Sequence, residues 1–103
     1  MAKGEREAVR ARFGSLFDEV SAALFSDDPI GINFGTNTDE YDPEVGTILP
    51  RLHTCTSASD TARVVHEEFA RWFGAATAGR CDRYENVAQV IWRLWQQHKQ
   101  PST

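Results

Sequence analysis

The sequence is poor in the features that usually mark secretion or membrane insertion. Its 103 residues include only two cysteines, Cys55 and Cys81, too few for the disulfide framework of a small secreted domain. No apolar run approaches the roughly 18 residues that a membrane-spanning helix needs, and the charged N-terminal segment lacks the apolar core of a signal peptide. We therefore expect a cytoplasmic protein with two free thiols and no membrane partner.

Clusters of basic residues are missing as well. The chain has 11 Lys and Arg residues against 15 Asp and Glu, which gives a formal net charge of −4 and a pI near 5.3. Proteins that bind DNA or RNA usually present a basic face that neutralises phosphates. We therefore expect no nucleic-acid partner.

Motifs of common catalytic sites are also absent. The sequence has no Gly-x-Ser-x-Gly elbow, no phosphate-binding glycine loop and no His-Glu-x-x-His helix. Its apolar helical stripes contain no paired polar residues that could form a site inside the fold. We expect no catalytic residue and no cofactor, so a binding role is favoured over an enzymatic one.

Residues that could hold a metal are present but badly spaced. The zinc-capable side chains are separated along the chain, without the tight Cys-x-x-Cys pairs of structural zinc sites: His53, Cys55, His66 and Cys81. An EF-hand register over residues 33–44 would place Glu44 at its twelfth position, but Gly35 offers no oxygen at the third and Thr38 replaces the turn glycine. We expect no metal site.

What the sequence does have is helical periodicity. Apolar residues recur at intervals of three and four in four segments, residues 4–26, 43–53, 58–73 and 83–98, while residues 100–103 should fray. Hydrophobic residues make up 41% of the chain and charged residues 25%, as in ordinary globular proteins. This pattern predicts one compact all-α domain of four helices.

Local signals fix several helix ends. Pro29 should end the first helix, and Pro50 should shorten or kink the second, because proline lacks a backbone N–H. Asp42 is expected to cap the second helix ahead of Pro43. Ser57 with Asp60 resembles a capping box for the third.

The charge is distributed unevenly around the predicted loop at residues 29–41, which Ile30, Ile32 and Phe34 should anchor on the core. Six acidic residues and no basic residue lie within residues 27–44: Asp27, Asp28, Asp39, Glu40, Asp42 and Glu44. Such a segment can attract a basic protein and speed its encounter. The alternative is structural, since four of these residues sit where helices end or begin.

Two aromatic residues are added to this predicted contact surface. Tyr41 lies inside the acidic segment, where it should also pack at the start of the second helix. Trp92 lies beside Arg93, off the centre of the last helix's apolar stripe, and could anchor a partner if exposed. The alternative for Trp92 is that it widens the buried face of the helix.

The middle of the chain resembles a known pattern. Residues 28–32 (Asp-Pro-Ile-Gly-Ile) and 39–45 (Asp-Glu-Tyr-Asp-Pro-Glu-Val), followed by Ile48 and Leu49, are similar to a signature of small bacterial helical proteins that form a family of unknown function. The resemblance implies an all-α fold and a bacterial cytoplasmic origin, and it brings no catalytic residue with it. Pro50 departs from the smoother helix that follows the signature.

Taken together, these features favour a small acidic protein-interaction module. A concrete version is an immunity or antitoxin-like protein whose acidic segment binds a basic partner. One alternative is a small metal-binding protein or enzyme that uses the acidic loop and the His and Cys side chains. Another is a purely structural subunit of a homo-oligomer.

Overall fold

The computed structural model describes residues 3–29 and 41–99, and the predicted all-α fold is confirmed for them, with no β-strand in these ranges. The predicted loop at 30–40 and the predicted frayed tail at 100–103 lie outside the described residues. The elements are α1 (Lys3–Phe13), α2 (Ser15–Asp27), α3 (Asp42–Ile48), the 3₁₀ helix η1 (Leu49–Thr54), α4 (Ala58–Phe73), α5 (Ala75–Ala78), the 3₁₀ helix η2 (Cys81–Tyr84) and α6 (Glu85–Lys99).

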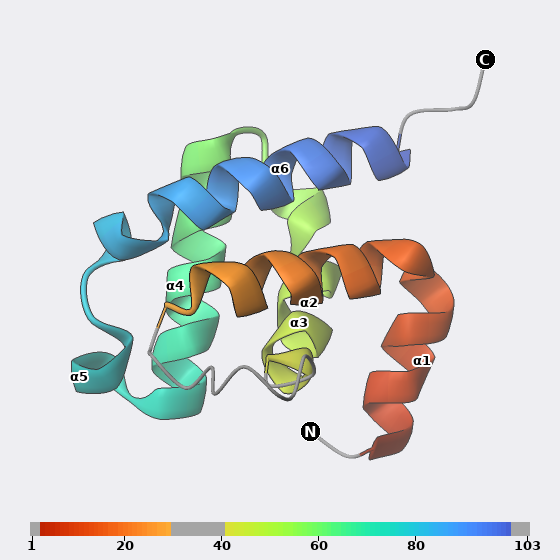
Figure 1. Cartoon of the computed structure of the whole chain (residues 1–103), viewed down its shortest axis with the longest axis horizontal. Coiled ribbons are helices and arrows are strands. Elements are labelled where there is room, and N and C mark those ends of the chain that lie inside the picture. Colours follow the sequence, from red (N-terminus) through yellow and green to blue (C-terminus); the bar gives the residue numbers. More distant parts are fainter. Residues whose placement is uncertain (1–2, 30–40, 100–103) are drawn as a thin grey trace.

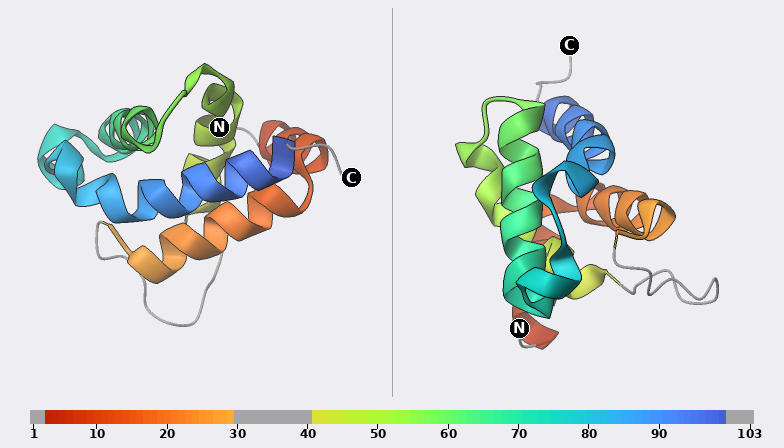
Figure 2. Two further views of the ribbon diagram at one scale, coloured as in Figure 1. Left: turned by 90° about the horizontal axis from the view of Figure 1, so that it is seen from above. Right: turned by 90° about the vertical axis from the view of Figure 1, so that its left-hand side faces the viewer.

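The helices form two layers. Helices α2 and α6 lie side by side and run in opposite directions, and α4 crosses behind them (Figure 1). In the left panel of Figure 2, which looks at the molecule from above, α4 and α1 are seen almost end-on. Both lie on the same side of the α2–α6 pair, the side that faces away from the viewer of Figure 1. Among the described elements, α6 packs most extensively on α4 and next on α2.

The core lies between these layers. As the periodicity predicts, the apolar stripe of α2 is buried through Leu16, Phe17, Val20 and Leu24. Helix α4 faces it with Val64, Val65 and Phe69, α6 with Val87 and Ile91, and α3 with Val45 and Ile48. Each large apolar side chain buried in this way contributes roughly 1.5–3 kcal/mol.

The first predicted helix is wrong in one respect, because residues 4–26 form two helices and not one. The break is Gly14, whose φ of 59° and ψ of −133° lie outside the helical region. A side chain is strained at such a positive φ, and glycine is not. The apolar spacing continues across the break, so periodicity alone could not reveal it.

The other helix ends differ from the prediction by smaller amounts. Helix α3 continues as the 3₁₀ helix η1 around Pro50, the shortening that this proline predicts. Ser57 caps α4 as predicted, accepting a hydrogen bond from the Asp60 N–H at 3.1 Å. The Asp60 carboxylate, however, accepts from the N–H and hydroxyl of Thr56, and these bonds hold its pKa below the ordinary value.

We predict that Gly14→Ala destabilises the fold by about 1–3 kcal/mol, because alanine would be strained at a φ of 59°. Gly4→Ala, within α1, is the matched control and should leave stability unchanged or raise it slightly. Urea unfolding followed by circular dichroism measures both. Equal stability of the Gly14→Ala variant and the wild type would contradict the role given to this turn.

Candidate functional site

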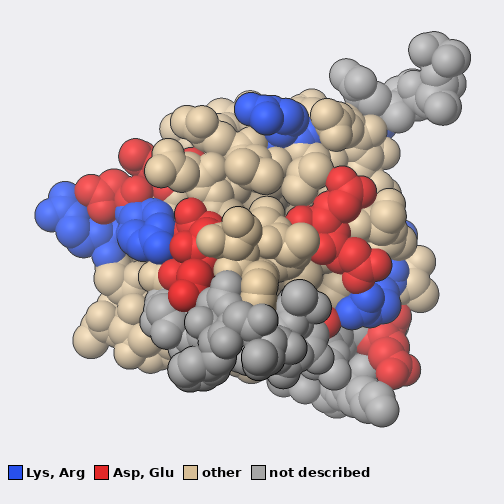
Figure 3. Space-filling model, viewed as in Figure 1, with Lys and Arg blue, Asp and Glu red and all other residues tan. Residues whose placement is uncertain are grey.

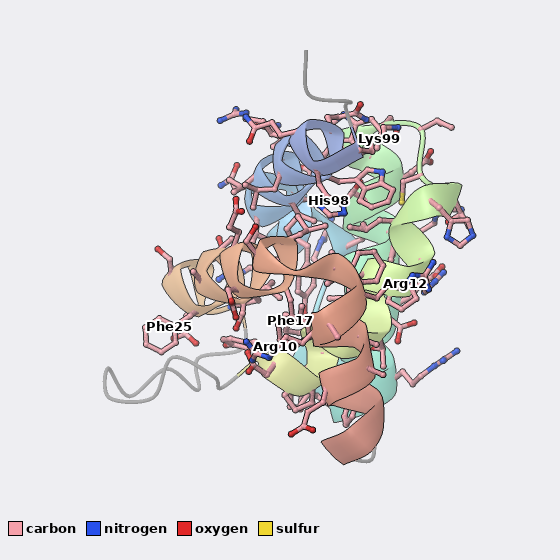
Figure 4. All side chains as sticks on the ribbon, turned by 90° about the vertical axis from the view of Figure 1, so that its right-hand side faces the viewer. Arg10, Arg12, Phe17, Phe25, His98 and Lys99 are labelled. Carbon is pink, nitrogen blue, oxygen red and sulfur yellow. The ribbon has the colours of Figure 1, made fainter. Side chains whose placement is uncertain are left out.

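Asp42 belongs to the predicted acidic contact surface, but its side chain is only 7% exposed. Its carboxylate accepts hydrogen bonds from Arg10 of α1, at 2.9 Å, and from the hydroxyl of Ser21 of α2. The Arg10 guanidinium also pairs with Asp18 and lies 4.5 Å above the ring of Phe17 (Figure 4). Asp42 therefore ties α3 to both N-terminal helices. The prediction that Asp42 is the N-cap of this helix is wrong, because Asp42 is the first residue of α3 and Tyr41 is its N-cap.

Glu44 is buried as well, at 3% exposure. Its Oε2 has no hydrogen-bond partner among the described residues. Burial raises the pKa of Glu44 from its ordinary 4.5 to about 7; the hydrogen bond to its own backbone opposes this shift, and the nearby Asp42 carboxylate adds to it.

The remaining described residues of the acidic segment hold the end of α2. Asp27 pairs with Arg83 at 2.9 Å, and the same guanidinium donates to the carbonyls of Asp27 and Asp28. A cation in this position satisfies the last carbonyls and the dipole of the helix. Tyr41 is fully buried and donates its hydroxyl proton to Asp28 at 2.6 Å.

Those of the predicted contact residues that the structure describes are therefore not gathered into one exposed surface. Asp39 and Glu40 lie outside the described residues, and Trp92 is partly buried against the core with the Lys99 ammonium 5.6 Å from its ring centroid. On the face drawn in Figure 3, acidic side chains lie beside basic ones at both sides and do not form a continuous acidic area.

The His and Cys side chains are also apart. Cys55 is buried and Cys81 is exposed, and His66 forms a 2.8 Å hydrogen bond with the carbonyl of Gly79. In the described part of the chain, no three His, Cys, Asp or Glu residues are grouped closely enough to hold a metal ion.

A hollow of about 580 Å³ lies elsewhere, between α1, α3, η1 and α4. We call it the α3–α4 hollow. It is lined by Val9, Gly46, Thr47, Pro50, Arg51, Glu68, Arg71 and Trp72. Apolar surfaces beside a few fixed polar groups are typical of ligand sites.

A buried carboxylate, that of Glu68, lies in the wall of the α3–α4 hollow and is 1% exposed. Its Oε2 accepts a hydrogen bond from Arg51 at 2.8 Å, whereas its Oε1 has no partner within the described ranges. Arg51 also binds Glu67 at 2.6 Å, and this bond lowers the pKa of Glu67. The guanidinium of Arg71 is 3.9 Å from Oε2, too far for a hydrogen bond.

The opposite wall is fixed by a second set of hydrogen bonds. The indole N–H of Trp72 donates to the Thr47 hydroxyl at 3.0 Å, and that hydroxyl donates to the carbonyl of Glu44 at 3.1 Å. Both the donor of Trp72 and the donor of Thr47 are thus in use. The orientation of the Trp72 ring against α3 is set by this chain of bonds.

The sequence analysis missed this site because it looked only for paired polar residues inside an apolar stripe. Thr61 and Glu68 are buried in α4 as single polar residues. A signal was present: Glu68 follows Val64 by four residues and precedes Trp72 by four, so it shares their helix face. A carboxylate in that position needs a buried partner or a ligand.

Comparisons with family models, curated proteins and solved structures found no match to this chain. Within residues 3–29 and 41–99, no helix is both long and apolar enough to cross a bilayer. The case for function therefore depends on the geometry of this chain alone.

We predict that Asp42→Ala destabilises the fold by about 3 kcal/mol, because it leaves the partly buried Arg10 and the buried Ser21 without their shared acceptor. Asp18→Ala is the matched control, since it removes the other carboxylate on Arg10, which is 65% exposed, and should cost under about 1 kcal/mol. Urea unfolding at neutral pH measures both. Equal losses from the two variants would contradict the role of Asp42.

We predict that Glu44 makes the fold less stable as the pH rises from about 4.5 to 7. Over this interval the unfolded chain releases the proton that folded Glu44 retains, so folding becomes less favourable by up to about 3 kcal/mol. Glu44→Gln should therefore have a larger free energy of unfolding than the wild type at pH 8. This difference between the two proteins should be smaller at pH 4.5. Glu7→Gln, at an exposed position, should follow the wild type; parallel pH profiles for all three proteins would contradict the prediction.

Proposed function

We propose that this chain is a non-catalytic protein-interaction domain, and that it binds a segment of a partner protein in the α3–α4 hollow. The observation that carries the proposal is the α3–α4 hollow itself, a recess of about 580 Å³ in which the side chains of Val9, Pro50 and Trp72 lie beside the Arg51–Glu68 ion pair. Apolar surface beside a few fixed polar groups is typical of sites that bind another molecule.

The walls of the hollow support the same proposal. Trp72 and Pro50 offer apolar surface beside charged groups, and Trp and Arg are the residues most enriched at the centres of protein interfaces. The Trp72 ring is already oriented by its bond to Thr47, so little side-chain freedom is lost when a partner binds.

The acidic segment supports a second version of this function, in which an immunity-like protein binds a basic partner. Its support is the charge distribution, with six of the 15 acidic residues and no basic residue within residues 27–44. Because Asp42 and Glu44 are buried and Asp27 is paired with Arg83, we assign the principal contact to the α3–α4 hollow.

Panning of a phage-displayed random peptide library on the wild-type protein tests the proposal. Enriched peptides should share a sequence pattern and bind Trp72→Ala at least about tenfold more weakly, since this variant removes the apolar wall of the hollow. Trp92→Ala is the matched control, because Trp92 is another partly buried tryptophan and lies on α6. It should bind the peptides as the wild type does.

Thermal unfolding shows whether both tryptophan variants are folded. Val9→Trp, which fills the hollow from α1, repeats the test if Trp72→Ala does not fold. Failure to enrich any peptide pattern, or peptides whose binding is lost equally in Trp92→Ala, would contradict the proposed site.

A further inference from the structure

A single residue, Gly14, separates α1 from α2. The residues on both sides of it, Phe13 and Ser15, belong to helices, so only the backbone of Gly14 leaves the helical conformation. Its φ of 59° and ψ of −133° turn α1 away from the line of α2, as Figure 1 shows at the right-hand end of α2. Glycine adopts positive and negative φ about equally readily, so the same residue can also form part of a helix.

The sequence around Gly14 also fits one continuous helix. Apolar residues recur at intervals of three and four across it: Val9, Phe13, Phe17, Val20 and Leu24. A continuous helix would pair backbone groups that the break leaves without their helical partners. The Phe17 N–H, for example, donates to the Gly14 carbonyl at 3.1 Å and would donate to the Phe13 carbonyl instead.

In the bent chain, α1 packs on α2, α3 and η1. Phe13 is buried, with its ring centroid 6.4 Å from that of Trp95, and Arg10 binds both Asp42 and Asp18. The Arg10–Asp18 pair requires the bend, because eight residues of straight helix span about 12 Å. A chain with the continuous helix therefore cannot keep α1 in this site on its own α3.

We propose that two copies of the chain exchange α1 and form a domain-swapped dimer. In each copy Gly14 becomes helical, α1 and α2 join into one helix over residues 3–27, and α1 docks on α3 and η1 of the other copy. Arg10 of each copy then binds Asp42 of the other, and Val9 lines the other copy's α3–α4 hollow. Because α1 makes the same contacts in both states, the hinge and the entropy of association decide between them.

Two features of the hinge favour this exchange. It is one residue long, and a short hinge promotes swapping because a longer one lets the segment fold back on its own chain. Gly14 is also exposed, and among the described residues only its own chain neighbours come within 4 Å of the position that a Cβ would take. No packed side chain therefore opposes a change in its backbone.

Gly14→Ala tests the proposal, because alanine is strained at a φ of 59° and favours a helix. We expect this variant to lower the dissociation constant of the dimer at least about tenfold relative to the wild type. Light scattering after size-exclusion chromatography, over a series of protein concentrations, measures it. Gly4→Ala is the matched control, since Gly4 lies within α1 in both states, and it should leave the constant unchanged. A Gly-Ser-Gly insertion after Gly14 should leave only monomer.

A mixed dimer shows whether α1 is exchanged. In a dimer of one ¹³C-labelled and one unlabelled copy of Gly14→Ala, we expect NOEs between Arg10 of one copy and the Phe17 ring of the other. The guanidinium carbon of Arg10 lies 4.5 Å from this ring centroid, and the swap makes the contact between copies. A dimer that keeps this NOE within one chain overturns the proposal, and so does a folded Gly14→Ala that stays monomeric at every concentration.

If Gly14→Ala does not fold, the wild type decides the question. Refolding from urea at high protein concentration should leave a dimer fraction with the same NOE between copies, because α1 can then dock on another chain before its own. Refolded protein that contains no such dimer overturns the proposal. The result is independent of the proposed function, since the α3–α4 hollow is present in both states and peptide binding does not require the exchange.

Discussion

The carboxylate of Asp42 is the polar contact that ties α3 to both N-terminal helices. It lies at the start of α3 and receives Arg10 from α1 and Ser21 from α2. Gly14 makes this possible, since the turn between α1 and α2 brings two helices to the same acceptor from different directions. A buried carboxylate is costly unless its partners are well placed, so these three side chains constrain one another's positions.

This constraint also shapes the α3–α4 hollow. Val9 precedes Arg10 on α1, and Gly46 and Thr47 follow Asp42 on α3, so the Arg10–Asp42 pair sets how far apart two walls of the hollow stand. The third wall comes from α4, where Trp72 is tied to Thr47. The hollow is therefore bounded by elements that polar contacts hold in register, as a site for specific binding requires.

The sequence alone predicts the all-α class, the buried stripes of α2, α4 and α6, the cap at Ser57 and the effect of Pro50, because each depends on local spacing or local chemistry. It does not predict which acidic residues turn inward. Asp42 and Glu44 sit in a polar, charged segment, and the partners of Asp42 are Arg10 and Ser21, more than 20 residues away in sequence. The Glu68 site follows from local reasoning only in part: Trp72 shares the helix face of Glu68, but Arg51 meets Glu68 only when η1 and α4 pack together.

Glu44 and Glu68 show why one buried carboxylate is assigned to stability and the other to binding. Each keeps one oxygen without a partner in the described chain. The charged neighbour of Glu44 is Asp42, which repels a negative charge and favours the protonated form. The charged neighbour of Glu68 is Arg51, which attracts it and fixes its orientation at 2.8 Å. The Arg51–Glu68 pair is therefore a fixed part of the wall of a hollow of about 580 Å³, whereas a carboxylate that is repelled by its neighbour is suited to titration.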